Sequence, residues 1–403
     1  MKKGFLQAGH LPTLFASFLY FDVSFMVWVM LGPLAVLIAK DIGLNAAQKG
    51  LMVATPVLAG AFLRIVAGVV AQHIGPKRAG ILAQLVVIGA LAAAWFIGLH
   101  SFEQMLMVGV ALGVAGASFA IALPLTSQWY PSEHQGTALG IAGAGNSGTV
   151  LAALFAPGLA ALFGWRNVLG LAGLPLLVVV AVFILAAKDS PARPAALSAR
   201  SYFKLLVVPE AWMLMAFYSV TFGGFVGLAS SLPIYFHDQY GLSPVIAGYV
   251  TALCVFTGSM LRPVGGAIAD RIGGLKTLSL VYLVAFAALM AAATGLPAMP
   301  LALMAFVVAM GSLGIGNGAV FQLVPQRFRN EVAIMTGLVG MTGGVGGFYL
   351  ASSLGFSKYL TGSYAAGLSI FAALAAVAFV AVVLVLRREG VWSPLVAQQD
   401  AAE

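Results

Sequence analysis

The sequence has very few charged residues and almost no cysteine. Charged residues make up 8% of its 403 residues, whereas a soluble protein carries about 25%. The single cysteine, Cys254, excludes an intrachain disulfide and any metal site built from several cysteines. The sequence also lacks a nucleophile motif and paired catalytic carboxylates, so we expect no enzymatic activity, no metal and no cofactor.

Hydrophobic residues make up 61% of the chain and form runs of twenty or more residues. A helix of about 20 residues crosses the hydrocarbon core of a bilayer and satisfies its own backbone groups there. We therefore predict an all-α integral membrane protein embedded in the lipid bilayer. The expected spans are 12–38, 47–73, 78–99, 102–127, 134–161, 166–187, 210–236, 244–270, 275–296, 299–324, 331–358 and 362–387.

The net charge of +8 does not indicate a nucleic-acid partner, because the basic residues are sorted between the loops. With both termini placed in the cytoplasm, 14 of the 20 Lys and Arg residues lie on the cytoplasmic side, as the positive-inside rule requires. We predict a multi-pass protein of the inner (plasma) membrane with both termini cytoplasmic. The hydrophobic run after Lys2 and Lys3 is too long for a signal peptide, so we expect the first helix to be retained.

Two arginines, Arg64 and Arg262, lie in the middle of the second and eighth predicted spans, 198 residues apart. A guanidinium group at that depth costs about 2.5–3.5 kcal/mol on insertion scales, and it does not lose its proton. Each arginine is therefore expected to face a polar cavity that holds something negative. Two such cations offered to one shared site are typical of a carrier for a small anion.

The same offset of 198 residues aligns Gly75 with Gly273 and Gly145 with Gly343. This internal repeat predicts two six-helix halves related by an axis along the membrane normal, with the substrate between them at the midplane. The predicted divisions are an N-terminal half at 1–187, a basic proline-rich cytoplasmic linker at 188–205, a C-terminal half at 206–390 and a cytoplasmic tail at 391–403.

The fifth and eleventh spans contain dense runs of glycine. The first run satisfies G-x-G-x-x-G, but no strand precedes it and no acid follows at the distance that a dinucleotide site needs. In a membrane, closely spaced glycines let two helices approach and slide past each other. We predict a gating or helix-packing role, with or without substrate contact, for Gly143, Gly145, Gly148, Gly340, Gly343, Gly344 and Gly347.

Asp22 is the one carboxylate well inside a predicted span. An acid at this depth is a candidate for proton coupling. It can equally be a structural partner for an arginine or for a helix end, and the sequence leaves both roles open.

Two loops resemble the cytoplasmic loop motif of the major facilitator superfamily: GVVAQHIGPKR at 68–78 and GAIADRIGGLK at 266–276. The second copy has Asp270, Arg271 and Gly273 in the motif positions, whereas the first has Gln72 where an acid is usual. The resemblance implies the fold of that superfamily, with twelve transmembrane helices in two pseudo-symmetric halves, and locates a conformational loop motif.

The paired glycine runs, together with one arginine each in the second and eighth spans, resemble the nitrate/nitrite porter family of this superfamily. The resemblance extends over nearly the whole chain and includes GVAGASFAIALP in the fourth span and TFGGFVG in the seventh. It implies nitrate and nitrite as substrates. It also implies a set of substrate-binding residues: Arg64, Arg262, Asn146, Phe119, Tyr218 and Phe222.

These residue types suit a planar oxyanion. The flat guanidinium of arginine matches coplanar oxygens better than the point charge of lysine. Phe119 and Phe222 could sandwich the anion and exclude water, while Tyr218 and Asn146 can donate further hydrogen bonds.

We therefore expect a monomeric carrier whose two halves rock about a central site, as a nitrate/proton symporter or a nitrate/nitrite antiporter. Two rival functions remain: transport of another small anion such as an organic carboxylate, and a membrane sensor that does not transport.

Overall fold

The computed structural model describes residues 5–191, 199–328 and 331–387. In these residues the regular elements are all helices, and twelve segments are long and apolar enough to cross a membrane. The predicted all-α fold with twelve spans is confirmed, and the predicted ends agree to within a few residues. Lys2, Lys3, the middle of the predicted linker and the predicted tail lie outside the described residues.

The first six spans contain α2 (Leu11–Trp28) with α3 (Leu31–Ile42), α4 (Ala46–Ile74), α5 (Pro76–Ile97), α6 (Phe102–Gly116) with α7 (Phe119–Ser127), α8 (Ser132–Gly143) with the 3₁₀ turn η1 (Ala144–Ser147) and α9 (Gly148–Phe163), and α10 (Trp165–Leu171) with α11 (Gly173–Ala186). The last six are α13 (Pro209–Tyr240), α14 (Pro244–Ile272), α15 (Gly274–Ala293), α16 (Met299–Arg327), α17 (Val332–Thr361) and α18 (Ala365–Arg387). Two short helices, α1 (Phe5–Ala8) and α12 (Ala199–Leu206), lie outside the spans, and α12 overlaps the end of the predicted linker.

Four of the first six spans are interrupted, whereas each of the last six is a single helix. Between α2 and α3 the backbone tightens, because Met30 N–H donates to the Val27 carbonyl and Gly32 N–H to the Val29 carbonyl. Such shorter-range bonds form a local 3₁₀ turn, and Pro33 supplies no N–H to restore the regular ladder. Breaks of this kind leave backbone carbonyl groups available inside the membrane.

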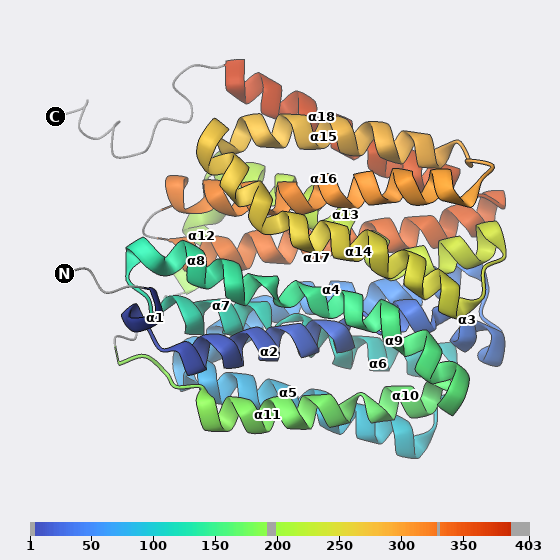
Figure 1. Ribbon diagram of the computed structural model, residues 1–403, viewed down its shortest axis with the longest axis horizontal. Coiled ribbons are helices and arrows are strands. Elements are labelled where there is room, and N and C mark those ends of the chain that lie inside the picture. Colours follow the sequence, from blue (N-terminus) through green and yellow to red (C-terminus); the bar gives the residue numbers. More distant parts are fainter. Residues whose placement is uncertain (1–4, 192–198, 329–330, 388–403) are drawn as a thin grey trace.

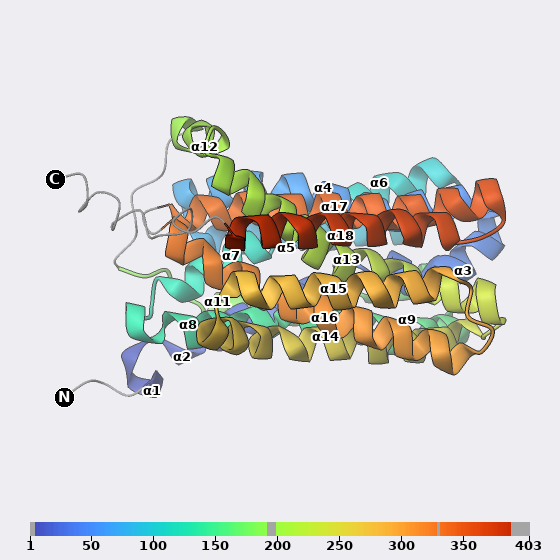
Figure 2. The same ribbon diagram turned by 90° about the horizontal axis from the view of Figure 1, so that it is seen from above.

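The spans form two groups that lie side by side, α2–α11 and α13–α18 (Figure 1). Across the boundary between them α4 packs along α17, α9 along α14, and α3 against α13. Helix α2 begins and α18 ends at the same end of the bundle (Figure 1), and α12 projects from that end (Figure 2). We call the opposite end, where α3 turns into α4, the outer end, following the predicted topology; the other is the inner end.

The internal repeat is visible in the backbone. Gly75 follows α4 with φ 98° and ψ 142°, and its repeat partner Gly273 follows α14 with φ 95° and ψ 140°. Only glycine adopts this conformation without strain. The two arginine-bearing helices therefore end in the same turn, which agrees with two copies of one structural unit.

Candidate functional site

Arg64 and Arg262 come together in the interior between the two halves. Their side chains are 1% and 9% exposed, and the two charges are close enough to interact. Arg64 Nε donates to the Gly116 carbonyl at 3.1 Å, and its Nη1 donates to the Gly340 carbonyl at 2.5 Å. Gly116 is the last residue of α6, where carbonyl groups lack intrahelical partners.

Some guanidinium nitrogens in this interior remain unpartnered. Arg64 Nη2 and Arg262 Nη1 are buried and have no hydrogen-bond acceptor among the described residues. None of the ion pairs found in the described chain includes either arginine. A buried charge without a counter-charge is costly, so the arrangement is suited to receive an anion.

Aromatic rings surround both guanidinium groups. The Phe119 ring centre lies 5.5 Å from Arg64 Cζ and 6.0 Å from Arg262 Cζ, so this ring is shared by both cations. Phe222 lies 5.2 Å from Arg64 Cζ and stacks on Tyr218 at 5.1 Å. The Tyr218 hydroxyl in turn interacts with Arg262. Five of the six predicted substrate-binding residues are thus joined in one central cluster (Arg64, Arg262, Phe119, Tyr218 and Phe222).

The sixth predicted residue, Asn146, lies in η1. This turn packs against α2 and against α14, the helix that carries Arg262. The Asn146 side chain is 1% exposed, and both its amide nitrogen and its amide oxygen lack a partner among the described residues. It is therefore a buried side chain with its full hydrogen-bonding capacity unused.

Asp22 does not pair with either arginine. Ser147 Oγ donates a hydrogen bond to Asp22 Oδ1 at 2.7 Å, whereas the backbone N–H of Gly148 donates to the Gly145 carbonyl. The contact joins Asp22 of α2 to η1, directly before α9 begins. The two roles that the sequence leaves open for Asp22, proton coupling and structural pairing, both stay predictions.

The predicted glycines differ in their surroundings. A Cβ at Gly145 would lie 2.6 Å from the Phe21 ring, and one at Gly343 would lie 2.6 Å from the Tyr218 ring. A Cβ on Gly344 would meet Ala61 at 2.6 Å. The remaining members fall into two sets: Gly148, Gly340 and Gly347 also lie against a neighbouring helix or the central cluster, whereas Gly143 faces open space.

The residues of the loop motif, Asp270, Arg271 and Gly273, are exposed at the inner end and lie apart from the central cluster. Their conformational role stays a prediction.

Sequence reasoning missed several residues at the site. The rings of Phe25 and Trp28 lie within 6.0 Å of Arg64 Cζ, and Phe321 lies 5.5 Å from Arg262 Cζ. Asn317, one helical turn from Phe321, is buried with both amide atoms unpartnered among the described residues. One signal was available, because the repeat offset pairs Asn317 with Phe119.

Comparison with known proteins agrees with this architecture. Residues 14–351 match the Major Facilitator Superfamily. A nitrite extrusion protein of Bacillus subtilis (strain 168) is 34% identical over 368 residues, which cover 90% of each chain. The chain belongs to the nitrate/nitrite porter family of the major facilitator superfamily.

Other members of this transporter family align over most of their length. A probable nitrate/nitrite transporter NarK2 of Mycobacterium tuberculosis (strain H37Rv) is 33% identical, with 88% of this chain and 91% of the relative covered. A probable nitrate/nitrite antiporter NarK1 of Thermus thermophilus is 29% identical, with 93% and 91% covered.

Solved structures support the fold. A bacterial homolog to the human lysosomal transporter Spinster, in an inward-facing and occupied conformation, superposes with a TM-score of 0.70 at 20% identity, covering 93% of this chain and 96% of that chain. An inward-facing and unoccupied form has a TM-score of 0.67 at 18% identity, with 95% and 96% covered.

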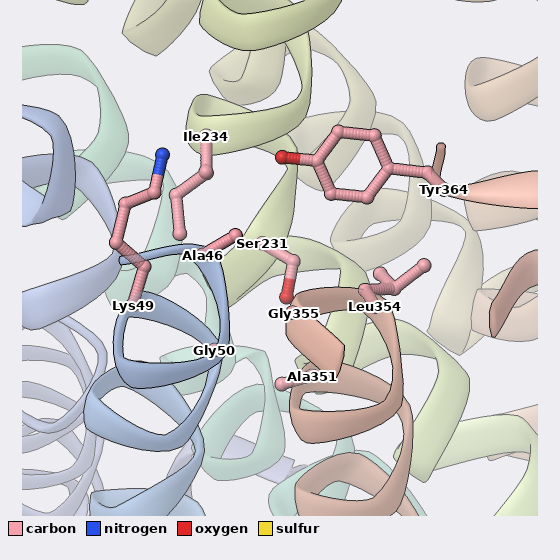
Figure 3. Close-up of a pocket in the computed structure, with 9 residues that line it drawn as sticks. All are labelled: Ala46, Lys49, Gly50, Ser231, Ile234, Ala351, Leu354, Gly355 and Tyr364. Atoms are coloured by element: carbon pink, nitrogen blue, oxygen red, sulfur yellow. The ribbon is translucent and has the colours of Figure 1, made fainter. Parts of the chain in front are cut away.

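In this porter the two halves are close together at the outer end. Lys49 Nζ of α4 lies 2.7 Å from Asp238 Oδ2 of α13, and the Tyr364 hydroxyl donates to the same oxygen at 2.8 Å. Lys49 and Tyr364 line a pocket together with Gly50, Gly355 and others (Figure 3). A Cβ at Gly50 would lie 2.7 Å from Gly355 Cα, so the backbones of α4 and α17 touch there.

The contact between α4 and α17 continues to the central cluster, where Gly344 and Gly340 lie against Ala61 and Arg64 of α4. A Cβ at Gly337, two turns nearer the inner end than Gly344, would meet nothing within 4 Å, so α17 has open space beside it there.

We expect Lys49→Met to loosen the outer end, because it removes a partly buried ion pair between the halves. A reporter Ser231→Cys in a Cys254→Ser background should then react several-fold faster with a membrane-impermeant thiol reagent.

The matched control is Arg166→Met, which removes the 2.6 Å pair with Asp41 inside the N-terminal half. This variant should leave the labelling rate unchanged. A Lys49→Met protein that labels as slowly as its parent would show that the pair does not hold the outer end closed.

Proposed function

We propose that this protein carries nitrate and nitrite across the inner membrane, binding one anion at a time between Arg64 and Arg262. The observation that carries the proposal is the presence of two buried guanidinium groups with unpartnered nitrogens and no carboxylate bound to either among the described residues. An anion of one negative charge would accept hydrogen bonds from these nitrogens and offset the buried charge.

The shape of the central cluster favours a small planar anion. Phe119 lies against both cations, and Phe222, which stacks on Tyr218, lies against Arg64. Rings packed this closely suit a flat ion and exclude water, which strengthens each charge-assisted hydrogen bond. Asn146 would add the donor of its unpartnered amide.

The names of the relatives support the same substrates, since they describe nitrite extrusion and nitrate/nitrite transport. An organic carboxylate is the rival substrate within the class. If it were the substrate, an added carboxylate would strongly inhibit nitrate uptake. If the proposal holds, nitrite should inhibit nitrate uptake and organic carboxylates should not. A sensor that does not transport would bind the anion without any flux.

Transport would proceed by alternating access, through rocking of the two halves. In the empty site the like charges of Arg64 and Arg262 repel each other across a poorly solvated interior. Anion binding removes this repulsion, so closure of the inner end would be favoured in the loaded protein and disfavoured in the empty one. The protein would act as a monomer with both termini in the cytoplasm.

The same coupling favours exchange of nitrate for nitrite, because only the loaded protein would change easily between its inward-facing and outward-facing states. Proton symport is the alternative, and it would require a group that binds and releases a proton. Asp22 is the proton-coupling candidate, although its carboxylate accepts a hydrogen bond from Ser147.

We expect Arg64→Lys and Arg262→Lys each to reduce nitrate uptake into proteoliposomes by about tenfold or more, because lysine keeps the charge but loses the planar fork of donors. Arg166→Lys is the control, since this arginine pairs with Asp41 at the outer end. If either variant took up nitrate at the wild-type rate, with equal amounts of folded protein in the membrane, that arginine would not belong to the proposed site.

Coupling is tested by measuring two fluxes in wild type and in Asp22→Asn: nitrate/nitrite counterflow, and nitrate accumulation driven by a pH gradient. Exchange predicts counterflow in both proteins and no response to the gradient. Symport predicts gradient-driven accumulation in wild type that is lost in Asp22→Asn while counterflow persists. Gradient-driven accumulation by wild type would therefore contradict pure exchange.

A further inference from the structure

The fifth span is broken at the point where Asn146 lies. Helix α8 ends at Gly143, the turn η1 occupies Ala144–Ser147, and α9 begins at Gly148. The backbone stays helical through this turn, and the Gly148 N–H donates to the Gly145 carbonyl, so the change from α to 3₁₀ geometry needs no acceptor from elsewhere. Asn146 and Ser147 lie in the turn, and neither side chain caps α9.

Asp22 contacts this turn from another helix. The residue is 7% exposed, and its carboxylate accepts a hydrogen bond from Ser147 Oγ at 2.7 Å. Ser147 directly follows Asn146 in the chain. A hydrogen bond to a charged acceptor is stronger than one between neutral groups, so this contact holds the turn against α2.

The two helices approach closely around this contact. A Cβ at Gly145 would lie 3.0 Å from the Asp22 backbone nitrogen, and one at Gly148 would lie 2.9 Å from the Met26 backbone nitrogen. Helix α2 is itself fixed against the central cluster, because the Phe21 ring contacts the Phe119 ring at 5.7 Å. Asp22 therefore links the turn that carries Asn146 to the helix that borders the arginine site.

We infer that Asp22 is a positioning residue for the anion site, which acts by holding η1 so that the unpartnered amide of Asn146 is presented to the substrate. The inference rests on the proposed function and deepens it. Without the Asp22 acceptor, the Ser147 hydroxyl loses its partner on α2, and the turn is free to rearrange.

This role requires that any side chain replacing Asp22 keeps a hydrogen-bond acceptor. Asparagine keeps one oxygen of the same reach, so Asp22→Asn can still accept from Ser147. Alanine removes the acceptor altogether. If Asp22 were needed for its proton, both variants would fail, because asparagine keeps the shape of aspartate but does not titrate.

The test is a double-mutant cycle on nitrate binding, measured by calorimetry on the purified protein. We expect Asp22→Ala and Asn146→Ala each to weaken binding by about tenfold, the loss of a hydrogen bond to a charged group, and Asp22→Asn to stay within about threefold of wild type. The double variant Asp22→Ala/Asn146→Ala should bind no more weakly than Asn146→Ala, because both changes remove the same interaction.

Ser24→Ala is the matched control. Ser24 is buried on the same helix, where it donates to the Tyr20 carbonyl and accepts from Gln84 Nε2 at 2.6 Å. Its loss should lower the melting temperature and leave nitrate affinity unchanged. Additive losses in the double variant, or an Asp22→Asn protein as weak as Asp22→Ala, would overturn the positioning role.

Hydrogen exchange separates this inference from the substrate assignment. In the unliganded protein, peptides covering the break between α8 and α9 should exchange faster in Asp22→Ala and at the wild-type rate in Asp22→Asn. If wild type bound neither nitrate nor nitrite, the proposed function would fail. Faster hydrogen exchange in Asp22→Ala would still show that Asp22 stabilises the turn. Unchanged hydrogen exchange in Asp22→Ala would contradict that role.

Discussion

The structure depends on two arginine charges that are buried without a counter-charge from the described chain. Arg64 is held by two backbone carbonyl groups, which orient it but do not neutralise it. Aromatic rings fill most of the remaining space, and the faces of such rings attract cations weakly compared with a full negative charge. The protein thus maintains a site whose electrostatic balance the proposed anion would complete.

The fold makes this arrangement possible because helices near the arginines are interrupted and contain glycines. The break after Gly116 releases a carbonyl for Arg64, and the Gly340 carbonyl of α17 accepts from its second nitrogen. At η1, the Ser147 hydroxyl reaches across to Asp22 of α2. Regular helices of ordinary composition would keep their carbonyls paired and their backbones apart.

Much of this could be predicted from the sequence, because the bilayer constrains it strongly. Hydrophobic length gave the spans, and the repeat offset paired Arg64 with Arg262. Rings such as Trp28 and Phe321 were not predicted, since an aromatic residue in a span gives the same sequence pattern whether it faces lipid, another helix or the site. The contact of Asp22 with Ser147 joins residues 125 positions apart, and the contact of Lys49 with Asp238 crosses between the halves; neither leaves a local pattern.

The central claim is that the anion completes the charge balance and thereby allows the inner end to close. Spin labels at Ile74 and Ile272, exposed repeat partners at the inner ends of α4 and α14, report this directly in a Cys254→Ser background by pulsed electron resonance. Replacing gluconate with nitrate should shift the distance distribution toward shorter values, and Arg64→Ala should abolish the shift. Distances that do not respond to nitrate, or that respond equally in Arg64→Ala, would contradict the account.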